Sequence, residues 1–174
     1  MILKIKSLVR DKKGMAAVEV AMLLPVMLVL ILGIVDLGNA IVLNKKTMTA
    51  ASISADLLTR SSSVDDVEMA DAWLASQMAL DPYNRGLFGL DVVSIQFQGS
   101  TATPVIRWRE TYNMPSNPNV LMLAQGLGNE GDGVMIVTAR YAYNPVFTHV
   151  LSDEIILQEV AVTRGRRHSF VSRE

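Results

Sequence analysis

The chain has 174 residues, a formal net charge of −1 and no cysteine. Its length allows one membrane helix and one modest soluble domain, and no repeat of solenoid length is present. The lack of cysteine excludes a disulfide framework and a thiolate metal site. The near-neutral charge gives no sign of a nucleic-acid partner, because such partners require an excess of basic residues.

The chain begins with a basic leader, residues 1–14, followed by a long apolar run. The basic residues of the leader are Lys4, Lys6, Arg10, Lys12 and Lys13. From Met15 to Val35 the only charged residue is Glu19. As a helix with a rise of about 1.5 Å per residue, this run would be roughly 32 Å long, close to the hydrocarbon thickness of a bilayer. Because basic residues stay on the cytoplasmic side, we predict a single membrane helix over residues 15–35, with a cytoplasmic N-terminus and an exported remainder.

Glu19 is the unusual residue of this apolar run. A carboxylate in hydrocarbon costs about 2.5 kcal/mol or more and usually has a partner. Cleavage after Gly14 would give Met15 a new α-amine with a reference pKa of about 8, and residues four positions apart share one face of a helix. We predict that Glu19 pairs with this amine in its own chain or in a neighbouring chain, and only the second pairing would specify assembly. A protonated Glu19 near the interface, with no partner, is the alternative.

A basic leader that ends in glycine, with a glutamate five positions later in an apolar helix, is the pattern of type IV prepilins and pseudopilins. The segment Gly14–Ala21, followed by Pro25 and Gly33–Gly38, resembles the TadE/TadF-like minor pseudopilins of the tight-adherence (Flp) pilus system. The resemblance covers roughly residues 12–55. One difference is Val20, since the residue after the glutamate is often aromatic in these systems. A weaker resemblance to the last strands of the family lies in Val137–Pro145 and Val160–Arg164.

The resemblance implies that a prepilin peptidase cleaves between Gly14 and Met15 and that Glu19 acts in assembly. It implies a single-pass protein of the bacterial inner membrane, with a periplasmic C-terminal domain, that assembles or primes a Flp-type pilus for surface adhesion and can enter the pilus itself. The implied partners are the membrane, the prepilin peptidase, other pseudopilins and the pilus assembly platform. Neither the TadE type nor the TadF type is favoured.

Two other interpretations stay open. The first is an uncleaved single-pass envelope protein whose exported domain acts as a scaffold or binding module. The second is a soluble exported protein released from a conventional signal peptide. The second is disfavoured because the apolar run is long and no good small-x-small cleavage site follows it.

Helical periodicity continues beyond the apolar run. Residues 36–60 are predicted to extend the membrane helix as an amphipathic stalk, and most of its apolar stripe is interpreted as the core face of the domain. Pro25 removes a backbone donor upstream, so a helix kink is predicted there. The stripe consists of Leu37, Ala40, Ile41, Met48, Ala51, Ala55 and Leu58.

An exported α+β domain is predicted for residues 61–174. Its second helix would begin at a capping box of Ser63 and Asp66 and extend to Leu80. The apolar residues on one face of this helix are Val67, Ala70, Leu74 and Met78.

A mainly antiparallel, pilin-like sheet of about four strands follows the second helix. In the second strand, Ile106 and Trp108 should lie on one face and Arg107 and Arg109 on the other. The predicted strands are a half-buried segment around Val93–Phe97, then Val105–Tyr112, Val134–Tyr143 and Ile155–Arg164. An excursion over residues 114–133, which surrounds the short apolar piece Val120–Ala124 and contains one helical turn, separates the second strand from the third. Residues 165–174 form a polar, solvated tail.

We predict that the chain is not an enzyme and that it uses no cofactor, metal or small-molecule substrate. His149 and His168 are its only histidines, and neither has a metal-ligand or triad spacing. The acidic residues at the start of the second helix are interpreted as helix-start electrostatics rather than a metal site. Asn129, Glu130 and Asp132 would suit calcium, but their spacing does not match an EF-hand loop, and a surface turn is preferred.

Overall fold

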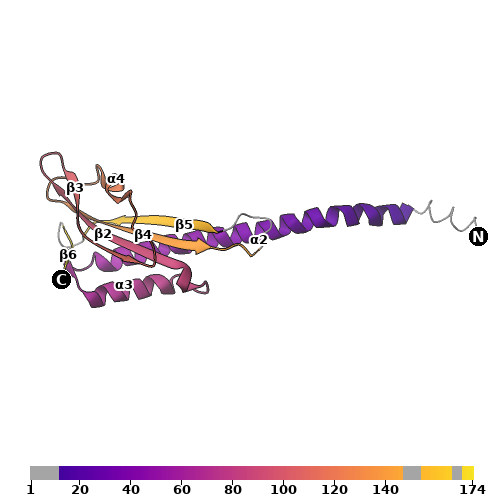
Figure 1. The fold of residues 1–174 in the computed structure, drawn as a ribbon, viewed down its shortest axis with the longest axis horizontal. Helices are drawn as coiled ribbons and strands as arrows, with labels where there is room; N and C mark the ends of the chain where they lie inside the picture. Colours follow the sequence, from indigo (N-terminus) through magenta and orange to yellow (C-terminus); the bar gives the residue numbers. More distant parts are fainter. Residues whose placement is uncertain (1–11, 147–153, 166–169) are drawn as a thin grey trace, which may run out of the picture.

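The computed structural model describes residues 12–146, 154–165 and 170–174. Its longest element is helix α2 (Lys12–Leu58), which has 47 residues. The predicted membrane helix and the predicted stalk are therefore parts of one continuous helix. The N-terminal half of α2 projects away from the folded domain, and its C-terminal half packs against that domain (Figure 1).

The domain is built on a four-stranded antiparallel sheet. Its strands are β2 (Phe88–Gln98), β3 (Thr103–Tyr112), β4 (Gly133–Tyr143) and β5 (Ile155–Thr163). They lie side by side in the order β3-β2-β4-β5. Helix α3 (Asp66–Met78) packs beside α2, and α2 contacts β4 and β5 (Figure 1). This arrangement confirms the predicted α+β, pilin-like fold.

Two apolar clusters lie on opposite faces of the sheet. On the helix side, Leu43 and Leu58 of α2 pack with Phe88 and Leu90 of β2. On the other side, the short helix α4 (Val120–Ala124) covers a second cluster that includes Val93, Ile95 and Phe97. The predicted helical turn is therefore confirmed. The alternation in β2 predicted a half-buried strand, but the strand is buried on both faces because the excursion before β4 covers the side that would otherwise meet water.

Helix α3 begins at a capping box, although not at the predicted one. Asp65 accepts from the backbone of Glu68, and the Glu68 side chain accepts from the backbone of Asp65. The box lies two positions beyond the predicted Ser63, which belongs instead to strand β1 (Ser63–Val64). A carboxylate satisfies the orphan N–H groups of the first turn as well as a hydroxyl does.

The apolar face expected to form the core side of α3 points into solvent. Val67, Leu74 and Met78 are 66%, 50% and 57% exposed. The face that packs on α2 contains Met69, Ala72 and Ser76. Small residues let the two helices approach closely, and Ser54 of α2 donates to the main-chain oxygen of Ala72.

The stripe predicted along α2 is only partly its core face. Ala51, Ala55 and Leu58 are buried as expected, but Leu37, Ile41 and Met48 are exposed. The buried face of α2 also contains polar residues. These are Asp36, Thr47 and Ser54, and Thr59, which directly follows the helix, is buried as well.

Strand β3 departs from strict alternation at Arg107. Ser94 faces Trp108 across the ladder, while the next residue of β2, Ile95, faces Ile106. Arg107 is thus an extra residue, and it forms a β-bulge that moves Trp108 to the face opposite Ile106. Trp108 joins the helix-side cluster and Ile106 the other cluster, which corrects the prediction that the two share a face.

The C-terminus is tied to the domain rather than solvated. Strand β6 (Ser172–Arg173) pairs in parallel with β1, and Val171 is buried. Arg173 forms an ion pair with Asp66 at 2.5 Å. The prediction of a solvated tail is therefore wrong for residues 171–173; Arg166, Arg167 and His168 lie outside the described residues.

Candidate functional site

The N-terminal half of α2 carries all the predicted site residues. Every residue from Gly14 to Ile31 is exposed, and most are large and apolar. Burial of apolar surface is worth about 25 cal/mol per Å², so an apolar helix of this length requires an apolar environment. Among the described residues, α2 is the one helix long and apolar enough to cross a membrane, with the candidate span at Gly14–Leu58.

The predicted cleavage site lies in the first turn of α2. The helix begins at Lys12, so the bond between Gly14 and Met15 is close to its end. The first four N–H groups of a helix have no partner within the helix, and such ends open easily. A Cβ atom built on Gly14 would meet nothing within 4 Å. Gly14 and Met15 therefore lie at an exposed and uncrowded position of α2.

Glu19 is exposed on the same helix, one turn after Met15. Within the described part of the chain, no hydrogen bond or ion pair of Glu19 is found. Residues four positions apart on an α-helix lie one above the other, so α2 places Glu19 and the backbone nitrogen of Met15 on neighbouring turns of one face. The helical geometry that the predicted pairing needs is present.

Pro25 lies inside α2, and the helix continues past it without a break. Because proline has no N–H, the carbonyl of Ala21 lacks its usual donor there. An apolar groove of about 260 Å³ runs along this part of the helix, and its lining residues are Val20, Leu23, Leu24, Met27, Leu28 and Ile31. The kink at Pro25 stays a prediction.

Asp36, the first residue after the apolar run, is fully buried. Its carboxylate accepts from the main-chain N–H of Val146 at 3.0 Å and from the hydroxyl of Tyr143 at 3.4 Å. Burial, with the Asp36 carboxylate nearby, raises the pKa of Tyr143 above its ordinary value. Sequence reasoning missed this junction, although an acid directly after an apolar run was a visible signal.

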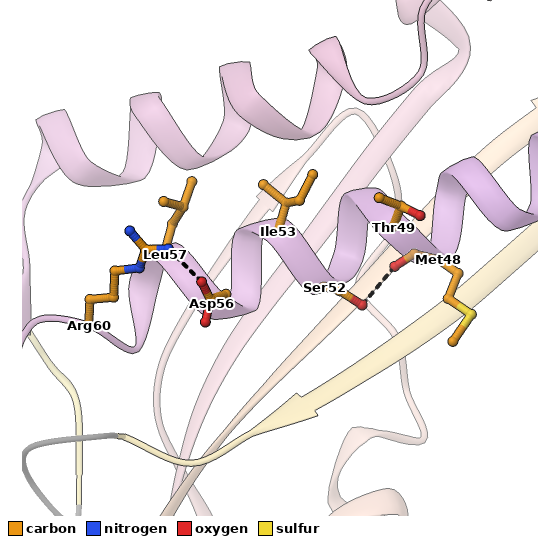
Figure 2. A pocket seen from close by; sticks show the side chains of 7 residues that line it. All are labelled: Met48, Thr49, Ser52, Ile53, Asp56, Leu57 and Arg60. Carbon is orange, nitrogen blue, oxygen red and sulfur yellow. Dashed lines mark hydrogen bonds and ion pairs between the residues drawn. The ribbon is translucent and has the colours of Figure 1, made fainter.

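A shallow hollow of about 370 Å³ lies on the exposed side of α2, between α3 and β5 (Figure 2). Its apolar residues are Met48, Ile53 and Leu57. At one end Arg60 and Asp56 form an ion pair at 2.7 Å. The hydroxyls of Thr49 and Ser52, which also line the hollow, donate to the main-chain oxygens of Lys45 and Met48 in the same helix.

A buried polar network ties the excursion before β4 to the sheet. Asp91, which is fully buried, accepts from Arg109 Nε at 2.8 Å and from the main-chain N–H of Asn117 at 2.8 Å. The Asn117 amide group donates to the hydroxyl of Thr138 at 3.1 Å. Among the described residues, no buried side-chain nitrogen or oxygen lacks a hydrogen-bond partner, as a rigid scaffold requires. The role of this network is structural.

Four acidic residues of the segments weighed for metal binding have partners within the chain: Asp65, Asp66, Glu68 and Asp132. In the loop after α4, the Asp132 carboxylate accepts from the Asn129 N–H at 2.9 Å, which makes it part of a turn. At the start of α3, Asp65 and Glu68 form the capping box and Asp66 pairs with Arg173. The described residues contain no group of three or more His, Cys, Asp or Glu side chains that could hold a metal ion. His149 and His168 lie outside the described residues.

Comparison with curated proteins and with solved structures gave no match. A family model does match, over residues 14–56, and its description is TadE-like protein. The matched region contains Gly14, Met15, Glu19, Pro25 and the buried Asp36, which are the residues described above. The N-terminal region of the chain, from the predicted cleavage site to the stalk, is therefore similar to the TadE-like family.

Proposed function

We propose that this protein is a minor pseudopilin that a prepilin peptidase processes and that acts in assembly of a Flp/Tad-type pilus for surface adhesion. The observation that carries the proposal is the TadE-like match over residues 14–56, because it begins at the proposed cleavage site and includes the whole apolar run. The projection of this run beyond the folded domain supports the same role (Figure 1).

The proposed arrangement in the bacterial inner membrane follows from the helix. Residues 1–14 form the cytoplasmic leader, residues 15–35 cross the membrane, residues 36–60 form the stalk and residues 61–174 form the periplasmic domain. Helix α2 has 47 residues and is therefore roughly 70 Å long, which is enough to span the hydrocarbon and still pack along the sheet. The partners would be the membrane, the prepilin peptidase, other pseudopilins and the assembly platform.

The chemical step would be hydrolysis of the peptide bond between Gly14 and Met15. Water adds to the carbonyl of Gly14, the C–N bond breaks, and Met15 leaves with a free α-amine that takes up a proton near neutral pH. The peptidase supplies the catalytic groups, and this chain supplies an accessible bond in a helical first turn that opens easily.

After cleavage, Met15 would become the start of the membrane helix. The positive ammonium and the N–H groups of the first turn would then lie one turn from the Glu19 carboxylate. If this carboxylate pairs with the amine of a neighbouring subunit, each buried charge offsets the desolvation of the other, and one register is preferred. The same bond within one chain would stabilise the subunit without specifying assembly.

The test is the intact mass and N-terminal sequence of the membrane-extracted protein from cells with and without the prepilin peptidase. We expect a mature chain that starts at Met15 only when the peptidase is present. An intact chain in both samples would contradict processing and favour an uncleaved envelope scaffold, an outcome that Val20 in place of an aromatic residue would help to explain. Loss of the whole apolar run would identify a conventional signal peptide instead.

A further inference from the structure

The Asp36 junction sets how close one end of the domain lies to Val35, the last residue of the apolar run. Tyr143 and Val146 both bond to Asp36, so the end of β4 lies beside the first residue after the apolar run. Asn39, which lines a hollow with these two residues, is three positions further along α2, a rise of about 4.5 Å. We name this region the membrane-proximal end; it contains the end of β4, the start of β2 and the 3₁₀ helix η1 (Arg85–Leu87).

The first hollow at the membrane-proximal end has a volume of about 260 Å³ and a largely apolar lining. Three tyrosines line it, which is three of the four in the chain. Val146, at its edge, is 70% exposed. Tyr141 and Tyr143 form the buried floor of the hollow, and Tyr83 is half-buried at its surface. Tyrosine is enriched where proteins meet the headgroup region of a bilayer, because the ring is apolar and the hydroxyl is polar, so Tyr83 and Val146 are the residues that suit the interface. The residues used in this reasoning are Asn39, Tyr83, Leu87, Tyr141, Tyr143 and Val146.

A second hollow of about 240 Å³ shares Leu87 with the first. It contains Arg140, which is half-buried. Of the arginines in the described residues, Arg140 alone has no hydrogen bond or ion pair with another described residue. Its cross-strand neighbours, Gly89 and Gln158, are both uncharged. A guanidinium that is partly withdrawn from water and lacks a protein partner suits an anionic ligand, above all a phosphate.

The position of Arg140 relative to the bilayer indicates that its anionic ligand is a lipid phosphate. It precedes Tyr143 by three residues on β4, or about 10 Å along the strand. The polar headgroup region is roughly 5–8 Å thick on each side of the hydrocarbon. The flexible arginine stem can cover the remaining distance. Arg140 is therefore within reach of a lipid phosphate on the leaflet from which α2 emerges.

We propose that the membrane-proximal end is a phospholipid-binding surface: Arg140 binds the headgroup phosphate of an anionic lipid, and the tyrosine-lined hollow with Val146 contacts the interface beside it. The proposal rests on the membrane span and orientation given under the proposed function, but it does not depend on cleavage or on pilus assembly. Such binding would hold the domain close to the bilayer until the subunit is extracted.

The first test measures lipid retention by the full-length chain. Purified protein in detergent is incubated with phosphatidylglycerol or phosphatidylcholine, and bound lipids are counted by native mass spectrometry. We expect retention of phosphatidylglycerol to fall about fivefold in Arg140→Gln, which corresponds to about 1 kcal/mol for one basic residue near an anionic leaflet. Arg140→Lys should retain most of the binding, since it keeps the charge.

Arg107→Gln is the matched control, because Arg107 is exposed and already bonded to Gln96 on the strand pair β2–β3. Equal losses in Arg140→Gln and Arg107→Gln would overturn the proposal. Displacement of the lipid by inorganic phosphate at equal concentration would also overturn it, because the site would then be a simple anion site and not a lipid site.

The second test locates the surface in the bilayer and does not require any loss of binding. The chain has no cysteine, so Val146→Cys and Ser100→Cys each give one labelling position. With a nitroxide label in nanodiscs, position 146 should show interfacial depth, with greater accessibility to oxygen than to a polar relaxation agent, and position 100 should show full exposure to water. Equal aqueous exposure of the two labels would contradict the proposal.

Failure of this proposal differs from failure of the proposed function. A chain that alkaline carbonate extracts from membranes would lack the span, and both proposals would fall. A chain that stays in the membrane, with a water-exposed label at position 146, would leave the pseudopilin proposal intact and remove the lipid surface alone.

Discussion

The phenolic oxygen of Tyr143 lies 3.2 Å from the main-chain oxygen of Asp36, although the two residues are 107 positions apart in the sequence. The Asp36 carboxylate also accepts from the N–H of Val146. These bonds fasten the end of the central strand β4 to the helix at the first residue after its apolar run. The proposed span and the folded domain are therefore coupled at one buried carboxylate.

Asp36→Ala should destabilise the domain more than Tyr143→Phe. The first change leaves the Val146 N–H without its acceptor, a loss of about 1–3 kcal/mol, whereas the second removes one long hydrogen bond worth about 0.5–1.5 kcal/mol. The measurement is thermal unfolding of the full chain in detergent, followed by tryptophan fluorescence, since Trp73 and Trp108 both lie in the domain. The double variant should lose less than the sum of the two. An unchanged melting temperature in Asp36→Ala would show that the junction is not a stabilising contact.

Asp91→Ala should be among the most damaging single changes in the domain. It would remove the carboxylate that accepts from the partly buried Arg109 guanidinium and from the Asn117 N–H, and Arg109 would keep only the main-chain oxygen of Asn117, so we expect a loss of about 3 kcal/mol. The matched control is Asp81→Ala, which breaks the exposed ion pair with Arg85 and should shift the melting temperature much less. Asp91→Leu combined with Arg109→Met should be more stable than Asp91→Ala alone. If the double variant were the less stable one, the uncompensated charge would not be the cause.

The fold was predictable from the sequence because its signals are local. Alternation marked the strands, and periodicity with turn residues marked α3 and the excursion before β4. The packing face of α3 was not predictable in this way. Helical periodicity predicts that the stripe with the largest apolar side chains is the buried one. The buried face of α3 instead includes Ala72 and Ser76, because their small size permits close approach to α2. The bulge at Arg107 likewise depends on the partner strand and leaves no mark in the local alternation.

The proposed N-terminal site could be inferred from the sequence because Gly14, Met15 and Glu19 lie within six residues of one another, and it stays a prediction. The Asp36 junction and the Asp91 network were missed because each depends on residues far away in the chain. Asp36 meets Tyr143 only after the sheet has formed, and Asp91 meets Asn117 only when the excursion folds back. An acidic residue that the fold buries needs a partner, but the sequence does not show which residue that partner is.

Ala72→Leu tests the packing face of α3. A larger side chain at this fully buried position should push α3 away from α2 and cost about 1–3 kcal/mol. Leu74→Ala, on the opposite face, should change the free energy of unfolding by about 0.5 kcal/mol or less. Denaturant titration of both full-length variants in detergent compares them directly. The reverse order of the two effects would mean that Leu74, and not Ala72, faces α2.

Stability should fall at alkaline pH because of three tyrosines. Burial raises the pKa of Tyr112, Tyr141 and Tyr143 above the ordinary value. The folded state favours the neutral phenol, so this stabilisation is complete below the unfolded pKa of about 10 and is lost as the pH rises through the folded-state values.

Free energies of unfolding measured by denaturant titration between about pH 8 and pH 11 should show this loss, with a limiting slope of about 1.4 kcal/mol per pH unit for each proton. Tyr141→Phe and Tyr143→Phe should each have a shallower slope above pH 10 than the unmodified chain. Because lysines also titrate in this range, the difference between variants is the informative quantity. Identical slopes in all three proteins would contradict the assignment to tyrosine.

Glu19→Gln should leave membrane insertion and cleavage intact and impair assembly. The amide has nearly the same shape and removes a charge from the apolar run, so insertion should not become harder. It cannot form an ion pair with the Met15 ammonium of a neighbouring subunit, and a hydrogen bond to a charged group is worth about 1.5–3 kcal/mol, which is tenfold or more in association. Pili counted by electron microscopy and sister subunits recovered by co-purification should both decrease. Glu130→Gln, in the exposed loop before β4, is the control and should assemble normally. Normal pilus number in Glu19→Gln, with confirmed cleavage at Met15, would mean that Glu19 pairs within its own chain or with nothing, and the register of assembly would have to come from the apolar faces of α2 alone.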